Sequence, residues 1–272
     1  MNDLAPIERL EAAMLALPQA DCPVIHRFGP GLYIREVHIP ADTFAIGHYQ
    51  RREHMNVFLK GRVSIVGENG LSSELVAPMM FVGKPGRKVG YTHEDVVWLN
   101  IYATHETDIE RLEETFLQKS ISWQEHRRIG HAQRLLCHLK DIDDYATVLV
   151  EFCISAETAL AQSENESDQI ALPLGSYKCK VGDSLIHGKG LFATAPIEAG
   201  EVIAPARIDG KRTLAGRYTN HSASPNARML CATHGRIDLV ATRMLRGCSG
   251  GLDGEEITIN YRQALSLQME EP

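Results

Sequence analysis

The chain has 272 residues, 44% hydrophobic and 23% charged, which is the balance of a globular protein with one large domain or two smaller ones. Its formal net charge of -7 excludes the strongly basic surface typical of nucleic-acid binders. The sequence shows neither a signal peptide nor a run of about 20 apolar residues, so we expect a cytoplasmic protein with no membrane partner. Its six cysteines are scattered without a C-x-x-C pair, so we expect neither disulfides nor structural zinc.

The N-terminal part begins with an expected short amphipathic helix within residues 1–20. From about Ile25 to Tyr102, apolar and polar residues alternate in short runs, for example over 33–39 and 57–66. Turn sequences at 68–70 and 84–86 separate such runs. Many short strands with regular turns are typical of a β-sandwich or a small β-barrel.

The middle part has a different period. Leu112, Phe116 and Leu117 recur at helical spacing, and the polar, acidic stretch 163–169 that follows has the composition of a linker. After it, glycine-rich strands and turns return. We therefore predict a mainly β protein with helices: a β-barrel domain over 1–107, a helical connector over 108–171 and a second β domain over 172–272.

Three segments of the last part concentrate polar side chains and glycines. They are Ile186–Ala193 with two glycines, Arg217–Asn226 with Asn, His and Ser in succession, and Gly254–Tyr261, which leads from a turn into a strand. Taken singly, each segment has an ordinary interpretation: a glycine-rich turn, a polar loop and an edge strand.

Together and in this order, the three segments resemble the SET-domain family of lysine methyltransferases, over about Tyr177 to Arg262. The family patterns are G-x-G-x-F/V-A, R-F-x-N-H-S-x-x-P-N and G-E-E-L-T-x-D-Y. This sequence has Tyr218 for the first aromatic residue, Ala223 where the family usually has cysteine and Asn260 where it usually has aspartate. The resemblance implies a compact SET-like β-fold with a pseudoknot, in which the segment 220–226 meets the last strand.

The same resemblance implies S-adenosylmethionine as cofactor and a lysine-bearing protein as partner. It makes Tyr261 the catalytic tyrosine. The cofactor-binding residues that it implies are Gly188, Lys189, Gly190, Asn220, His221 and Tyr261. Methyl transfer to an amine needs the neutral form of lysine, whose ordinary pKa is about 10.4, so the site must desolvate the amine and align it.

Two departures concern the substrate groove. Only sixteen residues, Ala204 to Thr219, lie where the family usually has a longer insert, and no cysteine-rich segment follows Tyr261. We expect a groove that is either minimal or built by other parts of the chain or by a second subunit. A SET-like domain that binds cofactor without turnover is the alternative.

The N-terminal part carries a second resemblance. His48 and His54, followed by Gly61, are similar to the first cupin motif, and Phe81–Gly86 is similar to the turn of the second. The resemblance implies a cupin-like barrel, a possible homodimer and a possible divalent metal at His48 and His54, completed by Gln50, Glu53 or His93. The alternative is a polar barrel lining without metal.

Three functions follow from these patterns. The first is an S-adenosylmethionine-dependent protein-lysine N-methyltransferase whose cupin-like part dimerises or recruits substrate. The second is a metal-dependent cupin enzyme with a regulatory SET-like part. The third is a non-catalytic binding or assembly protein.

Overall fold

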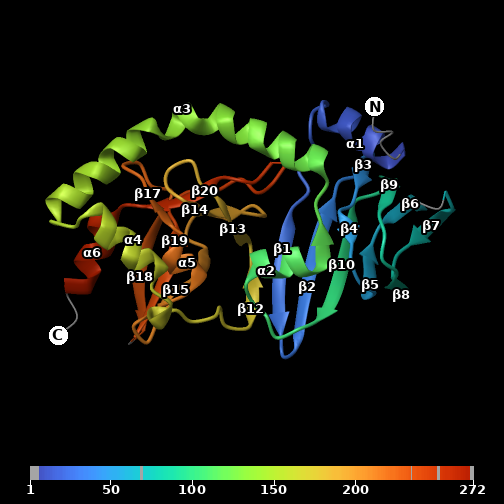
Figure 1. The fold of residues 1–272 in the computed structure, drawn as a ribbon. Coiled ribbons are helices and arrows are strands. Elements are labelled where there is room, and N and C mark those ends of the chain that lie inside the picture. Colours follow the sequence, from blue (N-terminus) through green and yellow to red (C-terminus); the bar gives the residue numbers. More distant parts are fainter. Residues whose placement is uncertain (1–5, 68–69, 234, 250–251, 270–272) are drawn as a thin grey trace.

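The computed structural model describes residues 6–67, 70–233, 235–249 and 252–269, and Figure 1 shows its fold. The chain is mainly β with helices, as predicted, and the predicted connector is helical. The helices are α1 (Pro6–Leu15), α2 (Ile109–Phe116), α3 (Ile121–Glu151), α4 (Ala156–Glu164), η1 (Glu166–Asp168), α5 (Leu214–Arg217) and α6 (Tyr261–Met269).

Two facing sheets form the N-terminal part. The six-stranded sheet has the order β12 (Gly175–Tyr177), β1 (Val24–Gly29), β2 (Leu32–Ile39), β10 (Val96–Ala103), β5 (His54–Lys60), β8 (Met79–Gly83). The four-stranded sheet has the order β3 (Phe44–Ile46), β9 (Lys88–Thr92), β6 (Arg62–Gly67), β7 (Ser72–Val76).

A small apolar core lies between these sheets. Phe58 and Val96 from the first sheet pack with Val63 and Leu75 from the second. No ladder joins the two sheets among the described strands. The predicted barrel is therefore corrected to a sandwich of two open sheets. The two sheets bury their inner faces against each other, but their edge strands are not joined by hydrogen bonds into a closed barrel.

The C-terminal part also contains two four-stranded sheets. One has the order β13 (Cys179–Asp183), β14 (Lys189–Ala193), β20 (Glu256–Ile259), β17 (Asn220–His221). The other has the order β16 (Lys211–Arg212), β15 (Val202–Ile208), β19 (Arg236–Ala241), β18 (Ala227–Thr233). A two-stranded ladder of β4 (Tyr49–Gln50) and β11 (Leu117–Gln118) lies in the N-terminal half.

The two halves share a sheet and a core. β12 pairs antiparallel with β1, with His26 opposite Tyr177. One cluster of buried side chains includes Phe28 and Tyr33 from the first half and Leu191 and Ile257 from the second. The division of the chain at residues 107 and 171 stays a prediction. The strand β12, which follows the second boundary, is the edge strand of the N-terminal six-stranded sheet.

The long helix α3 runs over both halves (Figure 1). Ser120 caps its N-terminus by accepting a hydrogen bond from the Trp123 amide. Near that end, Arg127 pairs with Asp253 at 2.7 Å, and farther along, Asp144 pairs with Arg262 at 2.9 Å. Ion pairs thus fix the helix at two distant points.

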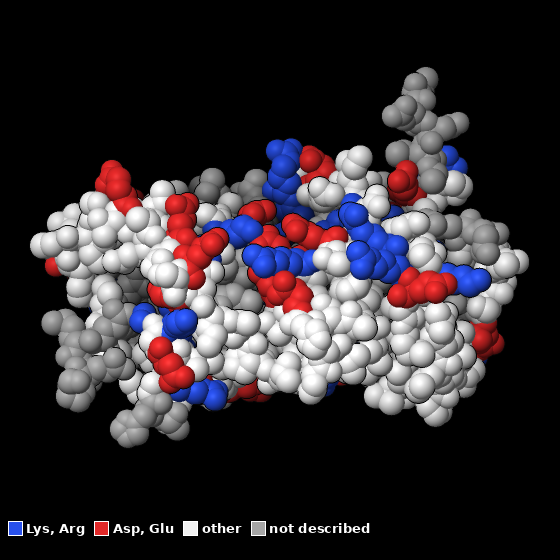
Figure 2. Space-filling view, turned by 60° about the horizontal axis from the view of Figure 1, so that its bottom comes forward, with Lys and Arg blue, Asp and Glu red and all other residues white. Residues whose placement is uncertain are grey.

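Acidic and basic side chains are interspersed on the face shown in Figure 2, so the described residues of that face form no single-sign patch. Within the described part of the chain, no helix combines the length and the apolar composition needed to span a bilayer.

Candidate functional site

Strand pairing brings the three C-terminal segments together. In the sheet β13–β14–β20–β17, Leu191 lies opposite Ile257, and Asn220 lies beside Thr258 in a parallel pair. The segment after β17 stays close to β20, because Ser222 N donates to Ile259 O at 2.9 Å. Asn226 then binds the same strand twice, donating to Glu256 O at 2.7 Å and accepting from Thr258 N at 2.8 Å.

The Asn220 amide ties all three segments together. Its Nδ2 donates to His187 O at 3.2 Å, to Lys189 O at 3.0 Å and to Glu256 Oε1 at 2.8 Å. All of its hydrogen bonds within the described protein use Nδ2, which leaves Oδ1 as an acceptor. The side chain therefore both shapes the glycine-containing turn and keeps an oxygen for a ligand.

The two glycines of that turn have different roles. Gly188 has φ +50°, a left-handed conformation that favours glycine, and a Cβ there would meet no atom within 4 Å. A Cβ on Gly190 would instead overlap the Glu256 carboxylate. Gly188 thus permits the turn, while Gly190 permits the close packing of β14 against β20.

A cavity of about 640 Å³ opens beside this turn. Gly188, Lys189, Asn220 and Tyr261 line it, whereas Gly190 and His221 do not. Four of the predicted site residues, taken from three separate segments, therefore line the same cavity. The Lys189 ammonium is held by Glu110 of α2 at 2.5 Å, which leaves the Lys189 backbone at the cavity.

Tyr261 is the first residue of α6. Its hydroxyl donates to Thr219 O at 3.2 Å, and the Tyr145 ring stands edge-on to it with centroids 5.9 Å apart. Burial raises the pKa of Tyr261 well above its ordinary value, and neighbouring Tyr145 and Glu256 add to this. The hydroxyl therefore stays protonated at neutral pH and can orient a ligand only through hydrogen bonds.

His221 acts through other residues. Its fully buried ring accepts a hydrogen bond from Tyr261 N at Nδ1, 3.1 Å, and meets Asp144 Oδ2 with Nε2 at 2.8 Å. Hydrogen bonds from Arg262 and then from His221 hold the pKa of Asp144 down, at about 2. This chain of contacts positions Tyr261 from α3, and His221 itself does not line the cavity.

The sequence reasoning missed the walls supplied by α3 and α4. Tyr145 lines the cavity, and so do Leu149 from α3 and Leu160 from α4. Helical spacing marked these segments as helices without indicating which face met a cavity. The groove expected from other parts of the chain is thus bordered by the predicted connector.

A second cavity, of about 330 Å³, lies between the sheets of the N-terminal part. His48 and His54 both line it, whereas Glu53 and His93 do not. Burial lowers the pKa of His48 to about 3, so this ring is neutral at neutral pH. Among the described residues, no group of three or more His, Cys, Asp and Glu side chains is placed to hold a metal ion.

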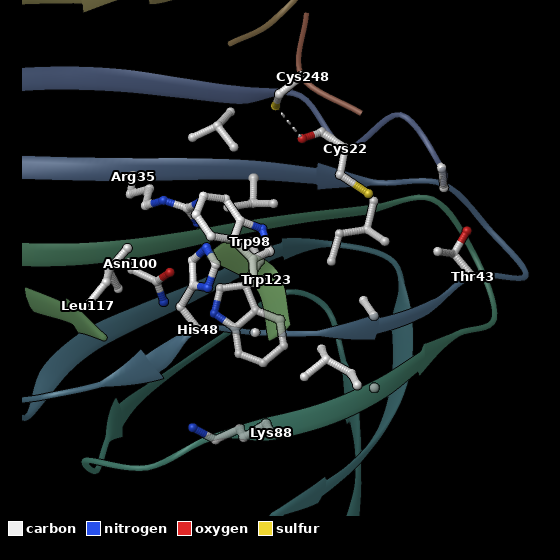
Figure 3. Close-up of a pocket in the computed structure, with 18 of the residues that line it drawn as sticks. Cys22, Arg35, Thr43, His48, Lys88, Trp98, Asn100, Leu117, Trp123 and Cys248 are labelled. Carbon is white, nitrogen blue, oxygen red and sulfur yellow. Dashed lines mark hydrogen bonds between the residues drawn. The ribbon is translucent and has the colours of Figure 1, made fainter. Parts of the chain in front are cut away.

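A row of polar residues that the sequence reasoning also missed crosses this cavity. His26, Arg35, Asn100 and Asn56 stand opposite one another on β1, β2, β10 and β5. Figure 3 shows Arg35 and Asn100 entering from the same side, beside the His48 ring and two indole rings. The available signal was a polar residue at an inward position in each of four strands.

Comparisons with known proteins add the following. No family model matches the chain, and no curated protein matches it significantly. A solved structure from Neisseria meningitidis is 13% identical with a TM-score of 0.26 and covers 35% of this chain and 96% of its own. A cupin protein from Bacteroides fragilis is 19% identical with a TM-score of 0.24, and the match covers 29% of this chain and 70% of that protein. KdgF from Halomonas sp. is 15% identical with a TM-score of 0.25, and the match covers 30% of this chain and 82% of KdgF. With TM-scores below 0.5, none of these likenesses bears on function.

Proposed function

We propose that this protein binds S-adenosylmethionine in the C-terminal cavity and methylates a lysine side chain of a partner protein. One observation carries the proposal: Gly188, Lys189, Asn220 and Tyr261, which come from three separate segments, line a single cavity of about 640 Å³. That volume suits a ligand of the size of a nucleoside conjugate. We place the activity in the cytoplasm.

The residues present fit the cofactor. The free Oδ1 of Asn220 suits an ammonium group, and the backbone at Gly188 and Lys189 can approach a ligand closely, because Gly188 has no side chain and the Lys189 ammonium is held at Glu110. When bound, the cofactor would supply an electrophilic methyl group on a sulfonium.

The chain's own residues would serve the acceptor amine. The protonated Tyr261 hydroxyl can accept a hydrogen bond from the amine and hold its nitrogen in line, which is a positioning role. The hydrophobic walls from α3 and α4 would exclude water and favour the neutral amine. Because its pKa is raised, Tyr261 is not the base that removes the proton.

The test is a calorimetric titration of the full chain with S-adenosylmethionine and with its demethylated product. We expect saturable binding by the wild type and its loss in Asn220→Ala, with thermal unfolding measured to check that the variant is folded. A folded wild type that binds neither compound would exclude the proposal. Labelled methyl transfer to lysine-containing proteins then tests the second half of it.

The second candidate, a metal-dependent enzyme of the N-terminal part, is supported by one feature: His48 and His54 line the same cavity. The described residues do not complete a ligand set, so we derive no metal step. Elemental analysis of the purified protein distinguishes the two candidates, because the methyltransferase needs no metal.

A further inference from the structure

Several buried polar atoms around the N-terminal cavity have no partner. Arg35 Nε, His26 Nε2, His48 Nδ1 and Asn56 Nδ2 are shielded from solvent and make no hydrogen bond within the described protein. A buried polar group without a hydrogen-bond partner destabilises the folded protein, so a cluster of such groups indicates a ligand that supplies the partners.

The unpartnered atoms offer mainly donors. Arg35 Nε and Asn56 Nδ2 can only donate. Burial lowers the pKa of His26 to about 3, so its ring is neutral, and Nδ1 lies 2.8 Å from the Tyr33 hydroxyl. If that hydroxyl donates, His26 Nε2 carries the hydrogen and becomes another donor. The complementary ligand group is an acceptor.

The charges around the cavity favour an anion. Each acid that lines it already has a cation: Lys119 lies 2.7 Å from Glu113, and Lys180 lies 3.0 Å from Asp253. The third acid, Glu11, pairs with Arg87 and keeps one oxygen without a partner. Arg35 makes no ion pair among the described residues and therefore remains as a positive charge beside the cavity.

The cavity wall next to Arg35 defines the rest of the ligand. On the inner face of the same strands, Val37 lies opposite Trp98, and both line the cavity. On the other side of Arg35, the row of Tyr33 and Tyr102 does not line it. The facing sheet adds Val63 and Ile65 to the cavity lining. The polar band therefore lies beside a hydrophobic wall made by Val37, Val63, Ile65 and Trp98.

From this arrangement we infer that the N-terminal cavity binds a small organic carboxylate, with its carboxylate on Arg35 and its apolar body against Val37, Val63 and Trp98. A guanidinium and a carboxylate form strong charge-assisted hydrogen bonds, and apolar walls reward a hydrocarbon body. An inorganic oxoanion would satisfy the donors but leave the apolar walls without contact. This site is separate from the proposed methyltransferase site and does not depend on it.

The sequence provides a built-in reporter. Its two tryptophans, Trp98 and Trp123, both line this cavity (Figure 3), so a change in intrinsic tryptophan fluorescence on binding reports on this cavity. We would titrate the full chain, kept in EDTA to remove metal, with hexanoate, with its neutral isostere hexanamide and with inorganic phosphate. Arg35→Met removes the charge, and Arg111→Met, whose side chain is 73% exposed, is the matched control.

We expect hexanoate to change the fluorescence saturably and to bind at least tenfold more tightly than hexanamide or phosphate. Arg35→Met should weaken hexanoate binding at least tenfold, and Arg111→Met should leave it unchanged. Equal affinity for acid and amide, binding of phosphate alone, or no binding by the wild type would each overturn the inference. If Arg35→Met fails to fold, the comparison of acid with amide on the wild type decides. Because the cavities are separate, loss of S-adenosylmethionine binding would leave this result intact.

Discussion

The two cavities of this molecule are built in different ways. The C-terminal cavity takes its polar groups from short contiguous segments that sheet pairing gathers at one place. The N-terminal cavity is crossed by a row of polar groups, one from each of four strands, aligned by register. Contiguous segments can be recognised in a sequence, whereas a row across a sheet becomes visible only when the strands are paired.

The largest effect that we expect tests whether the N-terminal cavity holds its histidines neutral. The pKa values of His26 and His48 are lowered to about 3, whereas the unfolded chain binds their protons below about 6.5. The free energy of unfolding should therefore fall as pH drops below 6.5, by about 3 kcal/mol between pH 6.5 and 5 from these two rings.

Urea unfolding at several pH values measures this dependence. His48→Phe should remove about half of it, and His105→Phe is the comparison, since His105 does not line the cavity. An unchanged slope in His48→Phe would mean that its ring takes up a proton in the folded protein.

The next effect tests the C-terminal cavity. Tyr261→Phe removes the hydroxyl that would orient the amine, and we expect methyl transfer to slow about 100-fold or more while cofactor affinity changes less than threefold. Single-turnover methyl transfer and calorimetry provide the two values. Tyr91→Phe likewise loses a hydroxyl, one that donates to the Asp42 carboxylate, and is the control that should act like the wild type. Equal rates for both variants would favour the non-catalytic alternative.

A third prediction concerns the support of Tyr261 from α3. Asp144→Ala leaves the buried His221 Nε2 without its partner and removes one of the two carboxylates that Arg262 binds, so we expect the free energy of unfolding to drop by about 2 kcal/mol. The neighbouring Asp143 is exposed, and Asp143→Ala should cost less than about 0.5 kcal/mol. Chemical denaturation compares the two variants, and similar losses of stability would contradict the role of Asp144 in supporting His221 and Tyr261.

The smallest effect separates the two glycines. Gly188→Ala meets no neighbouring atom but must adopt φ +50°, which costs about 1 kcal/mol. Gly190→Ala has no such backbone cost but must displace the Glu256 carboxylate, so it should be the less stable variant. Thermal unfolding of both ranks them, and the reverse order would contradict the packing of β14 against β20 described above.

The sequence predicted the mainly β composition and the helical connector, because alternation and helical spacing are local properties. The resemblance carried by three contiguous segments implied that Gly188, Asn220 and Tyr261 serve one site, and all three line the same cavity. The closed barrel was wrong, because ladder closure depends on pairing between distant strands. The roles of Arg35 and Tyr145 were not predictable, because no local pattern specifies what an inward strand position or one helix face will meet.

The pairing of β12 with β1 has a consequence for how the protein is made. Arg27 donates to Ser176 across 149 positions of sequence, so the first sheet lacks its edge strand until the ribosome has synthesised more than 170 residues. Until then β1 presents unpaired backbone groups, which favour aggregation. A nascent or truncated N-terminal half therefore has an open sheet edge. The last third of the chain covers that edge and also contributes most of the residues that line the C-terminal cavity.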